Sequence, residues 1–317
     1  MPFDSMPPLS EDDHRLVREA IAANVDLTLS MIPELVEDVL ARHRPLRSAV
    51  VLETCRSLGG ATQDLHTVAA VLEYLNVAAL LHRNLEIAEN ARRQQHEVQQ
   101  LWGSEASVLL GDYLLSISFQ TLTRLGNLDI LDAVALLTKD IARGQILEIS
   151  GNLWSVTPSQ WEQMTRQKRA SLFATGAKCG AIWAGGGDRL QADLYDYGMN
   201  LGLAVQARQD WQTACDPEAL STALSEGRLL LPVCLLLHEH GSPETREQWR
   251  SQLVTLPEAE KPAWLRERLA SDGIAERTEA WIQSRLADAH TALDENSGWP
   301  SETLRQLATL DLLEPAP

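Results

Sequence analysis

Glycine and proline are scarce in this sequence, with 18 glycines and 14 prolines among 317 residues. All-β and low-complexity proteins need many turn residues, so this scarcity disfavours both classes and favours long helices. Basic residues are also few, 27 against 44 acidic residues, which gives a net charge of −17. A protein that binds duplex nucleic acid or an anionic membrane needs clustered lysine and arginine, so we expect neither partner.

Only four cysteines occur, and no two of them form a C-x-x-C pair. We therefore expect reduced, mostly buried thiols rather than a zinc or redox site. The first residues lack both the basic and the apolar region of a secretory signal. An apolar run around residues 229–237 contains Pro232 and is too short to cross a bilayer. These absences predict a cytoplasmic protein without a membrane span.

Apolar residues recur at three- and four-residue spacing from Glu11 onward, which is typical of helices with one buried face. Glycine, proline and capping residues divide this pattern into about ten or more helices. The expected breaks include Gly59–Gly60 followed by a cap at Thr62, Gly103–Ser104, Gly126–Asn127, Thr157–Pro158, Gly185–Gly187 and Gly241–Pro243. The long apolar segments expected in the central bundle are 62–90, 105–125, 128–150, 158–184 and 188–214.

The domain organisation follows from this pattern. No change in composition marks a second domain, and no repeat of a helical solenoid is evident. The sequence predicts a tail over residues 1–10 and a single all-α domain over 11–317. Within that domain we expect a core bundle at about 40–240 and shorter, more charged helices at 241–317 that pack outside it.

Three stretches carry motifs that composition does not predict: residues 42–47 (RHRPLR), 80–93 (LLHRNLEIAENARR) and 201–210 (LGLAVQARQD). They resemble, without a gap, the G-K-x-x-R-P, L-H-D-D-x-x-D-x(4)-R-R and F-Q-x-x-D-D-x-x-D motifs of the trans-isoprenyl diphosphate synthases, the polyprenyl synthetase family. Further segments that resemble this family in the right order are 110–114 (LGDYL), 143–148 (RGQILE), 167–172 (QKRASL) and 226–232 (EGRLLLP). On these landmarks the chain is identified as a member of the family.

The resemblance implies an all-α isoprenoid synthase bundle, usually a dimer, that binds prenyl diphosphates. In this family two D-D-x-x-D clusters hold Mg²⁺ ions, which stabilise the pyrophosphate that leaves an allylic substrate. Carboxylates at positions i and i+4 of a helix share one face and can hold a hard cation between them. The double bond of isopentenyl diphosphate attacks the allylic cation, and the bundle interior holds the growing chain.

The sequence departs from this pattern at both aspartate clusters. The residues at the six aspartate positions are Arg83, Asn84, Ile87, Gln209, Asp210 and Thr213. One carboxylate in six positions does not supply the several oxygen ligands that Mg²⁺ prefers. We therefore expect no catalytic residue of the family type and no cofactor, with Mg²⁺ required only if the protein is active.

Alternatives stay open beside the first cluster. Glu86, Glu89 and Asp210 are candidates for a displaced metal site, and the other interpretation of Glu86 and Glu89 is an exposed acidic helix face. Arg83 could bind a diphosphate oxygen pair directly. It could instead form a salt bridge to Asp210 or Glu86 across the site.

Part of the family's anion site is retained. The candidate diphosphate-binding residues are Arg44, Arg92, Arg93, Lys168, Gln206 and Arg228. Ala78 and Ala79 stand where bulky residues of the family cap the chain pocket, so they predict room for a long prenyl chain, although alanine is also a common helix residue.

Three functions fit these residues. The first is a non-catalytic or regulatory subunit, a pseudoenzyme that forms a homodimer or a heterodimer with an active prenyl diphosphate synthase. The second is a still-active prenyltransferase or terpene-synthase-like enzyme with displaced metal ligands. The third is a metal-independent carrier of a prenyl diphosphate. The selective replacement of aspartates beside retained basic residues favours the first.

Overall fold

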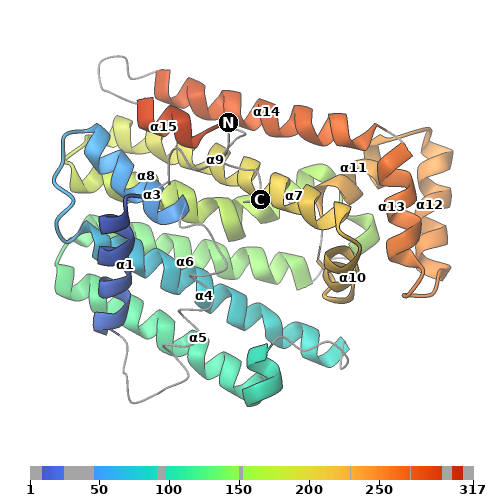
Figure 1. Cartoon of the computed structure of the whole chain (residues 1–317), viewed down its shortest axis with the longest axis horizontal. Coiled ribbons are helices and arrows are strands. Elements are labelled where there is room, and N and C mark those ends of the chain that lie inside the picture. Colours follow the sequence, from blue (N-terminus) through green and yellow to red (C-terminus); the bar gives the residue numbers. More distant parts are fainter. Residues whose placement is uncertain are drawn as a thin grey trace.

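The computed structural model describes residues 9–24, 46–90, 97–149, 153–228, 230–271, 273–294 and 302–309. Within these ranges every regular element is a helix and no strand occurs, which confirms the predicted all-α bundle of ten or more helices. Several long helices run along the long axis of the molecule (Figure 1). The elements are α1 (Glu11–Asn24), α3 (Leu46–Ser57), α4 (Leu65–Asn90), α5 (Glu97–Leu125), α6 (Leu128–Ile149), η2 (Leu153–Ser155), α7 (Pro158–Thr165), η3 (Arg166–Ala170), α8 (Ser171–Trp183), α9 (Asp188–Cys215), α10 (Pro217–Ser225), α11 (Leu231–Glu239), α12 (Pro243–Thr255), α13 (Lys261–Ser271), α14 (Ile274–Asp294) and α15 (Glu302–Leu307).

Most of the predicted breaks lie at observed helix boundaries. Gly126, with φ at +76°, ends α5, and the side chain of Asn127 accepts a hydrogen bond from the Ile130 N–H at 3.1 Å to start α6. Thr157 starts α7 with a capping box, in which its side chain and that of Gln160 bond to each other's backbone N–H.

Two predicted boundaries are wrong. The break expected at Gly103–Ser104 lies inside α5, which begins at Glu97. An interior glycine costs a helix only about 1 kcal/mol relative to alanine, and the packing of α5 along α4 offsets that cost. The cap expected at Thr62 is also misplaced, because a turn follows Thr62 and α4 begins at Leu65.

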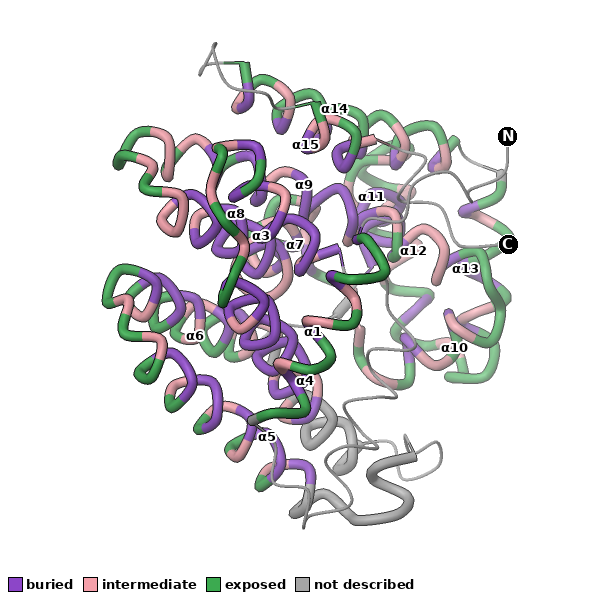
Figure 2. Tube along the Cα trace, turned by 60° about the vertical axis from the view of Figure 1, so that its left-hand side comes forward, coloured by how far each residue is buried: buried purple, intermediate pink, exposed green. Residues whose placement is uncertain are grey.

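Helix α8 lies at the centre of the bundle, in contact with α3, α4, α6 and α9. It is buried on nearly every side, as Figure 2 shows for α8 and its neighbours. A helix surrounded by others must be apolar all round, and small residues let its neighbours approach closely. Gly198 of α9 is such a contact, because a Cβ atom there would lie 2.5 Å from the carbonyl oxygen of Phe173.

The helices after Gly241 fall into two groups. Helices α12 and α13 pack with α10 and α11 around a second apolar cluster at one end of the molecule (Figure 1). We expected all of the later helices to lie outside the bundle, but α14 packs along α9 and buries Ile282, Leu286 and Leu293 in the main core. Leu9, from the expected tail, is also buried in this core.

One helical segment, Leu65–His82 of α4, is long and apolar enough to cross a membrane by length and composition. It is a different segment from the apolar run at 229–237, which is too short to cross a bilayer. Of its residues 78% are buried inside the protein. Burial by neighbouring helices accounts for the apolar composition, as in the core helix of a helical bundle.

Candidate functional site

Four of the predicted site residues line one cavity of about 40 Å³: Lys168, Gln206, Asp210 and Arg228. They come from separate parts of the chain, namely η3, α9 and the segment between α10 and α11. The remaining lining residues are Glu148, Trp161, Met164, Thr165 and Arg169. The fold therefore gathers three of the predicted anion-binding residues around Asp210.

Asp210 is buried, with 1% of its surface exposed, and three N–H groups bond to its carboxylate. Gln206, one helical turn earlier on α9, donates its amide to Oδ1 at 2.7 Å. The indole N–H of Trp161 and the backbone N–H of Leu231 both donate to Oδ2 at 2.9 Å. Burial raises the pKa of Asp210 to about 6, in spite of these donors and the positive charge of Arg228.

Lys168 lies in η3, a π-helical turn that joins α7 to α8. Such turns are frequent at functional sites. Gly144 of α6 makes room for it, since a Cβ atom at this position would lie 2.5 Å from Lys168 Cγ. The Lys168 ammonium group pairs with the Glu148 carboxylate, and both side chains are largely buried. An anion bound by Lys168 would therefore have to compete with Glu148.

The other described candidates do not line this cavity. Gln209 is exposed on α9 and Thr213 is half-buried. Ala78 is buried in α4 and Ala79 is half-buried, with its carbonyl oxygen accepting a hydrogen bond from Gln145 Nε2 at 2.9 Å. Gln145 therefore joins α6 to the helix that carries the first motif. The proposed chain-pocket role of the two alanines stays a prediction.

Several predictions fall on parts of the chain that the structure does not describe. Arg44, Arg92 and Arg93 lie outside the described residues. The helix α4 continues through the first motif, but the described side chains do not include those of Arg83, Asn84, Glu86, Ile87 and Glu89.

The residues that can be assessed do not fit a magnesium site of the family type. The Asp210 carboxylate is buried and bound by three N–H groups. Within the described part of the chain, no group of three His, Cys, Asp or Glu side chains is placed to hold a metal ion. Mg²⁺ prefers octahedral oxygen coordination, and a shielded single carboxylate does not provide it.

Two site residues were not identified from sequence. The bond from Trp161 to Asp210 spans 49 positions along the chain, so no local pattern indicates it. Glu148 stood at the end of the segment 143–148, and its place in a motif was the available signal. Its pairing with Lys168 depends on the approach of η3 to α6.

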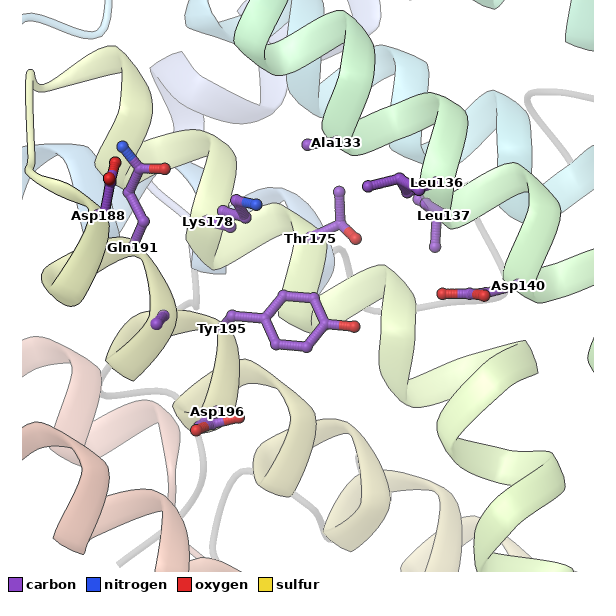
Figure 3. A pocket seen from close by; sticks show the side chains of 11 residues that line it. Ala133, Leu136, Leu137, Asp140, Thr175, Lys178, Asp188, Gln191, Tyr195 and Asp196 are labelled. Carbon is purple, nitrogen blue, oxygen red and sulfur yellow. The ribbon is translucent and has the colours of Figure 1, made fainter.

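A larger groove of about 430 Å³ lies between α6, α8 and α9, and Figure 3 shows the side chains that line it. Its polar lining includes Lys178 and Tyr195. The groove contains no predicted site residue. Among the residues that line the groove, Asp196 is the nearest in sequence to Gln206. The two residues are about 15 Å apart along the axis of α9. We therefore place the candidate site at the smaller cavity, where the motif residues meet.

Comparison with known proteins agrees with this geometry. Residues 30–265 match the family model of the polyprenyl synthetases. The chain is 28% identical over 260 residues to octaprenyl diphosphate synthase of Escherichia coli K12, covering 80% of each protein. It is 30% identical over 256 residues to a short chain isoprenyl diphosphate synthase of Methanothermobacter thermautotrophicus, covering 78% of each.

Solved structures show the same fold. A polyprenyl synthase from Caulobacter crescentus, complexed with calcium and isoprenyl diphosphate, superposes with a TM-score of 0.83 at 25% identity and covers 96% of this chain and 95% of that one. The fold and the motif-lined cavity define the class of all-α isoprenoid synthase bundles. Within this class, the chain belongs to the polyprenyl synthetase family.

Proposed function

We propose that this protein acts in isoprenoid biosynthesis as a non-catalytic or regulatory subunit of a heteromeric prenyl diphosphate synthase. The observation that supports this most is the state of Asp210, which is the one carboxylate at the six aspartate positions. It is buried and bonded to Trp161, Gln206 and Leu231, so it is directed toward the protein itself. Departure of pyrophosphate requires stabilisation of its negative charge, which metal ions supply in this family.

The retained basic residues support a second candidate, a metal-independent carrier of a prenyl diphosphate. Lys168 and Arg228 line the same cavity as Gln206 and can present cationic and amide donors to one anion. The third candidate, a still-active enzyme, needs Glu86 and Glu89 to replace the lost ligands. Asp210 does not support it, because its carboxylate is buried and already accepts hydrogen bonds from three N–H groups.

A product assay on the purified protein tests the proposal. The protein would be supplied with radiolabelled isopentenyl diphosphate, allylic diphosphates of different lengths, and either Mg²⁺ or EDTA. We expect no elongated product. Enzymes typically turn over about 1 to 1000 times per second, so an active protein would form product readily in this assay. Octaprenyl diphosphate synthase of Escherichia coli is the positive control.

The same assay separates the alternatives. Elongation that needs Mg²⁺ and is lost in Lys168→Ala would contradict the non-catalytic role. Retention of an allylic diphosphate in EDTA, without product, would favour the carrier. Stimulation or altered product length on addition of an active family member would support the subunit.

We propose further that the subunit pairs with a second copy, or with a homologue, through α6. Three of the large apolar residues exposed in the described structure lie on this helix: Leu128, Leu136 and Ile146. Its exposed face carries acidic residues, including Asp132, in the first half and basic residues, including Arg143, in the second. Two such helices in antiparallel orientation bring opposite charges together, which is a self-complementary surface for a two-fold dimer.

Sedimentation equilibrium tests this pairing. We expect the wild-type chain to be a dimer and Ile146→Asp to shift it toward monomer, because a buried, unpaired charge disfavours the interface. Val254→Asp is the matched control, since Val254 is as exposed as Ile146 but lies on α12. A monomeric wild type, or equal effects of the two substitutions, would rule out α6 as the interface.

A further inference from the structure

We propose that Asp210 is a positioning residue, which holds Gln206 and the Arg228 segment at the cavity by bonding to the start of α11, and that it is not a metal ligand. This inference rests on the proposed function only in assuming that the cavity receives an anion. Three contacts of Asp210 support it, with Leu231, Trp161 and Gln206.

The first contact supplies a cap that α11 lacks. The residue before the helix is Leu230, whose side chain forms no capping hydrogen bond. Leu230 and Leu231 are both buried, so water does not satisfy the N–H of Leu231. Asp210 Oδ2 accepts that N–H at 2.9 Å from a different helix. A carboxylate at a helix N-terminus also interacts favourably with the helix dipole.

The second contact fixes α7 against the same point. Trp161 is buried and donates its indole N–H to Asp210 Oδ2, while its ring packs edge-on against Trp281 of α14, with ring centroids 5.4 Å apart. One carboxylate therefore connects α7, α9 and α11. Loss of the acceptor would leave two buried N–H groups without a partner, which is expensive in a low-dielectric interior.

The third contact places the anion-binding candidates. Gln206 donates to Asp210 Oδ1, so its amide is held in one orientation at the cavity wall. Arg228 lies three residues before Leu231 and lines the same cavity. Fixing the Leu231 N–H thus limits where the Arg228 side chain can reach. Side chains that supporting contacts already hold in place bind a ligand more tightly, because fewer side chains have to be ordered on binding.

Charged groups from several elements surround Asp210. Arg228 faces it from the segment before α11, Lys168 and Arg169 from η3, and Glu148 from α6; the Cys234 thiol faces it from α11. The positive charge of Arg228 does not outweigh burial, because the pKa of the carboxyl is raised from its usual 3.8 to about 6. Ionisation of the buried Asp210 carboxyl therefore costs stability. This cost is consistent with a role that depends on its hydrogen bonds.

Unfolding as a function of pH tests the inference on the full chain. The pKa of Asp210 is about 6 in the folded protein, and its usual value of 3.8 applies to the unfolded chain. Between these values the folded state binds more protons at Asp210 than the unfolded state, so the contribution of this group to stability falls as pH rises. Relative to Asp210→Asn, the unfolding equilibrium constant of the wild type should rise about 50-fold between pH 4 and pH 7. We expect Asp210→Asn, which keeps an acceptor for Trp161 and Leu231, to be at least as stable at pH 7.

Asp210→Ala and Trp161→Phe complete this experiment. We expect Asp210→Ala to lower the melting temperature by about 5 °C or more, since it orphans two buried donors. In a protein that already carries Trp161→Phe, Asp210→Ala should lower stability less than it does in the wild type, as expected for groups in contact. Equal stability of Asp210→Ala and Asp210→Asn at all pH values would overturn the positioning role.

Calorimetric titration with inorganic pyrophosphate, in EDTA and in Mg²⁺, gives the second readout. Asp210→Asn keeps the acceptor for Trp161 and Leu231 but loses the one for Gln206, so we expect it to bind a few-fold more weakly than the wild type in EDTA. We expect Asp210→Ala to bind at least about tenfold more weakly than the wild type, a loss of 1.4 kcal/mol. Binding that needs Mg²⁺ and disappears in Asp210→Asn would show a metal ligand and overturn the inference. A wild type that binds no pyrophosphate would overturn the positioning of an anion site, whereas the non-catalytic role is judged by the product assay.

Discussion

Replacement of Gly198 by alanine is expected to lower the free energy of unfolding by about 3 kcal/mol, as for severe overpacking of a core. The added Cβ atom would lie 2.5 Å from the Phe173 carbonyl oxygen and 2.7 Å from Ala174 Cα. Both atoms belong to the backbone of α8, so no side chain can rotate away. Helices α8 and α9 would have to separate along the centre of the bundle. Urea denaturation followed by circular dichroism measures the change.

Gly187→Ala is the matched control for this prediction. Gly187 precedes α9 with φ at −70°, which alanine adopts readily, and a Cβ atom there would meet no atom within 4 Å. We expect its free energy of unfolding to stay within about 0.5 kcal/mol of the wild type. A similar loss in both variants would mean that the close approach of α8 and α9 is not what requires glycine at position 198.

Truncation of Glu73 to alanine is expected to cost about 3 to 5 kcal/mol of stability, because it leaves a buried arginine without its counter-charge. Arg47 Nη2 lies 3.1 Å from Glu73 Oε2, and Ser48 Oγ donates to Glu73 Oε1 at 3.2 Å. Both charged side chains are largely buried between α3 and α4. Arg47 ends the segment 42–47 that resembles a family motif, so this pair also anchors that segment to the bundle.

An exposed ion pair provides the comparison. Arg15 Nη1 lies 2.8 Å from Glu19 Oε1 on the surface of α1. Glu19→Ala should leave the free energy of unfolding nearly unchanged, since solvent screens an exposed pair. The double variant Arg47→Leu with Glu73→Ala should be less damaging than Glu73→Ala alone, because no uncompensated charge stays buried. If Glu73→Ala destabilises no more than Glu19→Ala, the buried pair does not hold α3 against α4.

Several helix boundaries governed by short-range chemistry were predicted correctly from sequence. The caps at Asn127 and Thr157 and the positive φ of Gly126 depend on residues within four positions of one another. The break at Gly103–Ser104 was wrong because the intrinsic preference of one glycine is weaker than the packing of a whole helix.

The candidate site was predicted only in part. Motif spacing identified Lys168, Gln206 and Arg228, and the structure places all three at one cavity. It did not identify the partners that decide their chemistry. The bond from Trp161 to Asp210 spans 49 positions, and the pair of Lys168 and Glu148 spans 20. No periodicity within a helix encodes such contacts.

By itself, the sequence determined that the protein is helical, where several of the long helices begin and end, and which family motifs it carries. These properties depend on hydrophobic periodicity, local capping and residue identity at fixed spacing. Only the tertiary structure decided that the retained acid, Asp210, is buried and bonded to three N–H groups. The reason is physical: burial and hydrogen-bond satisfaction depend on how α7, α9 and α11 pack together, and packing brings residues together irrespective of their separation along the chain.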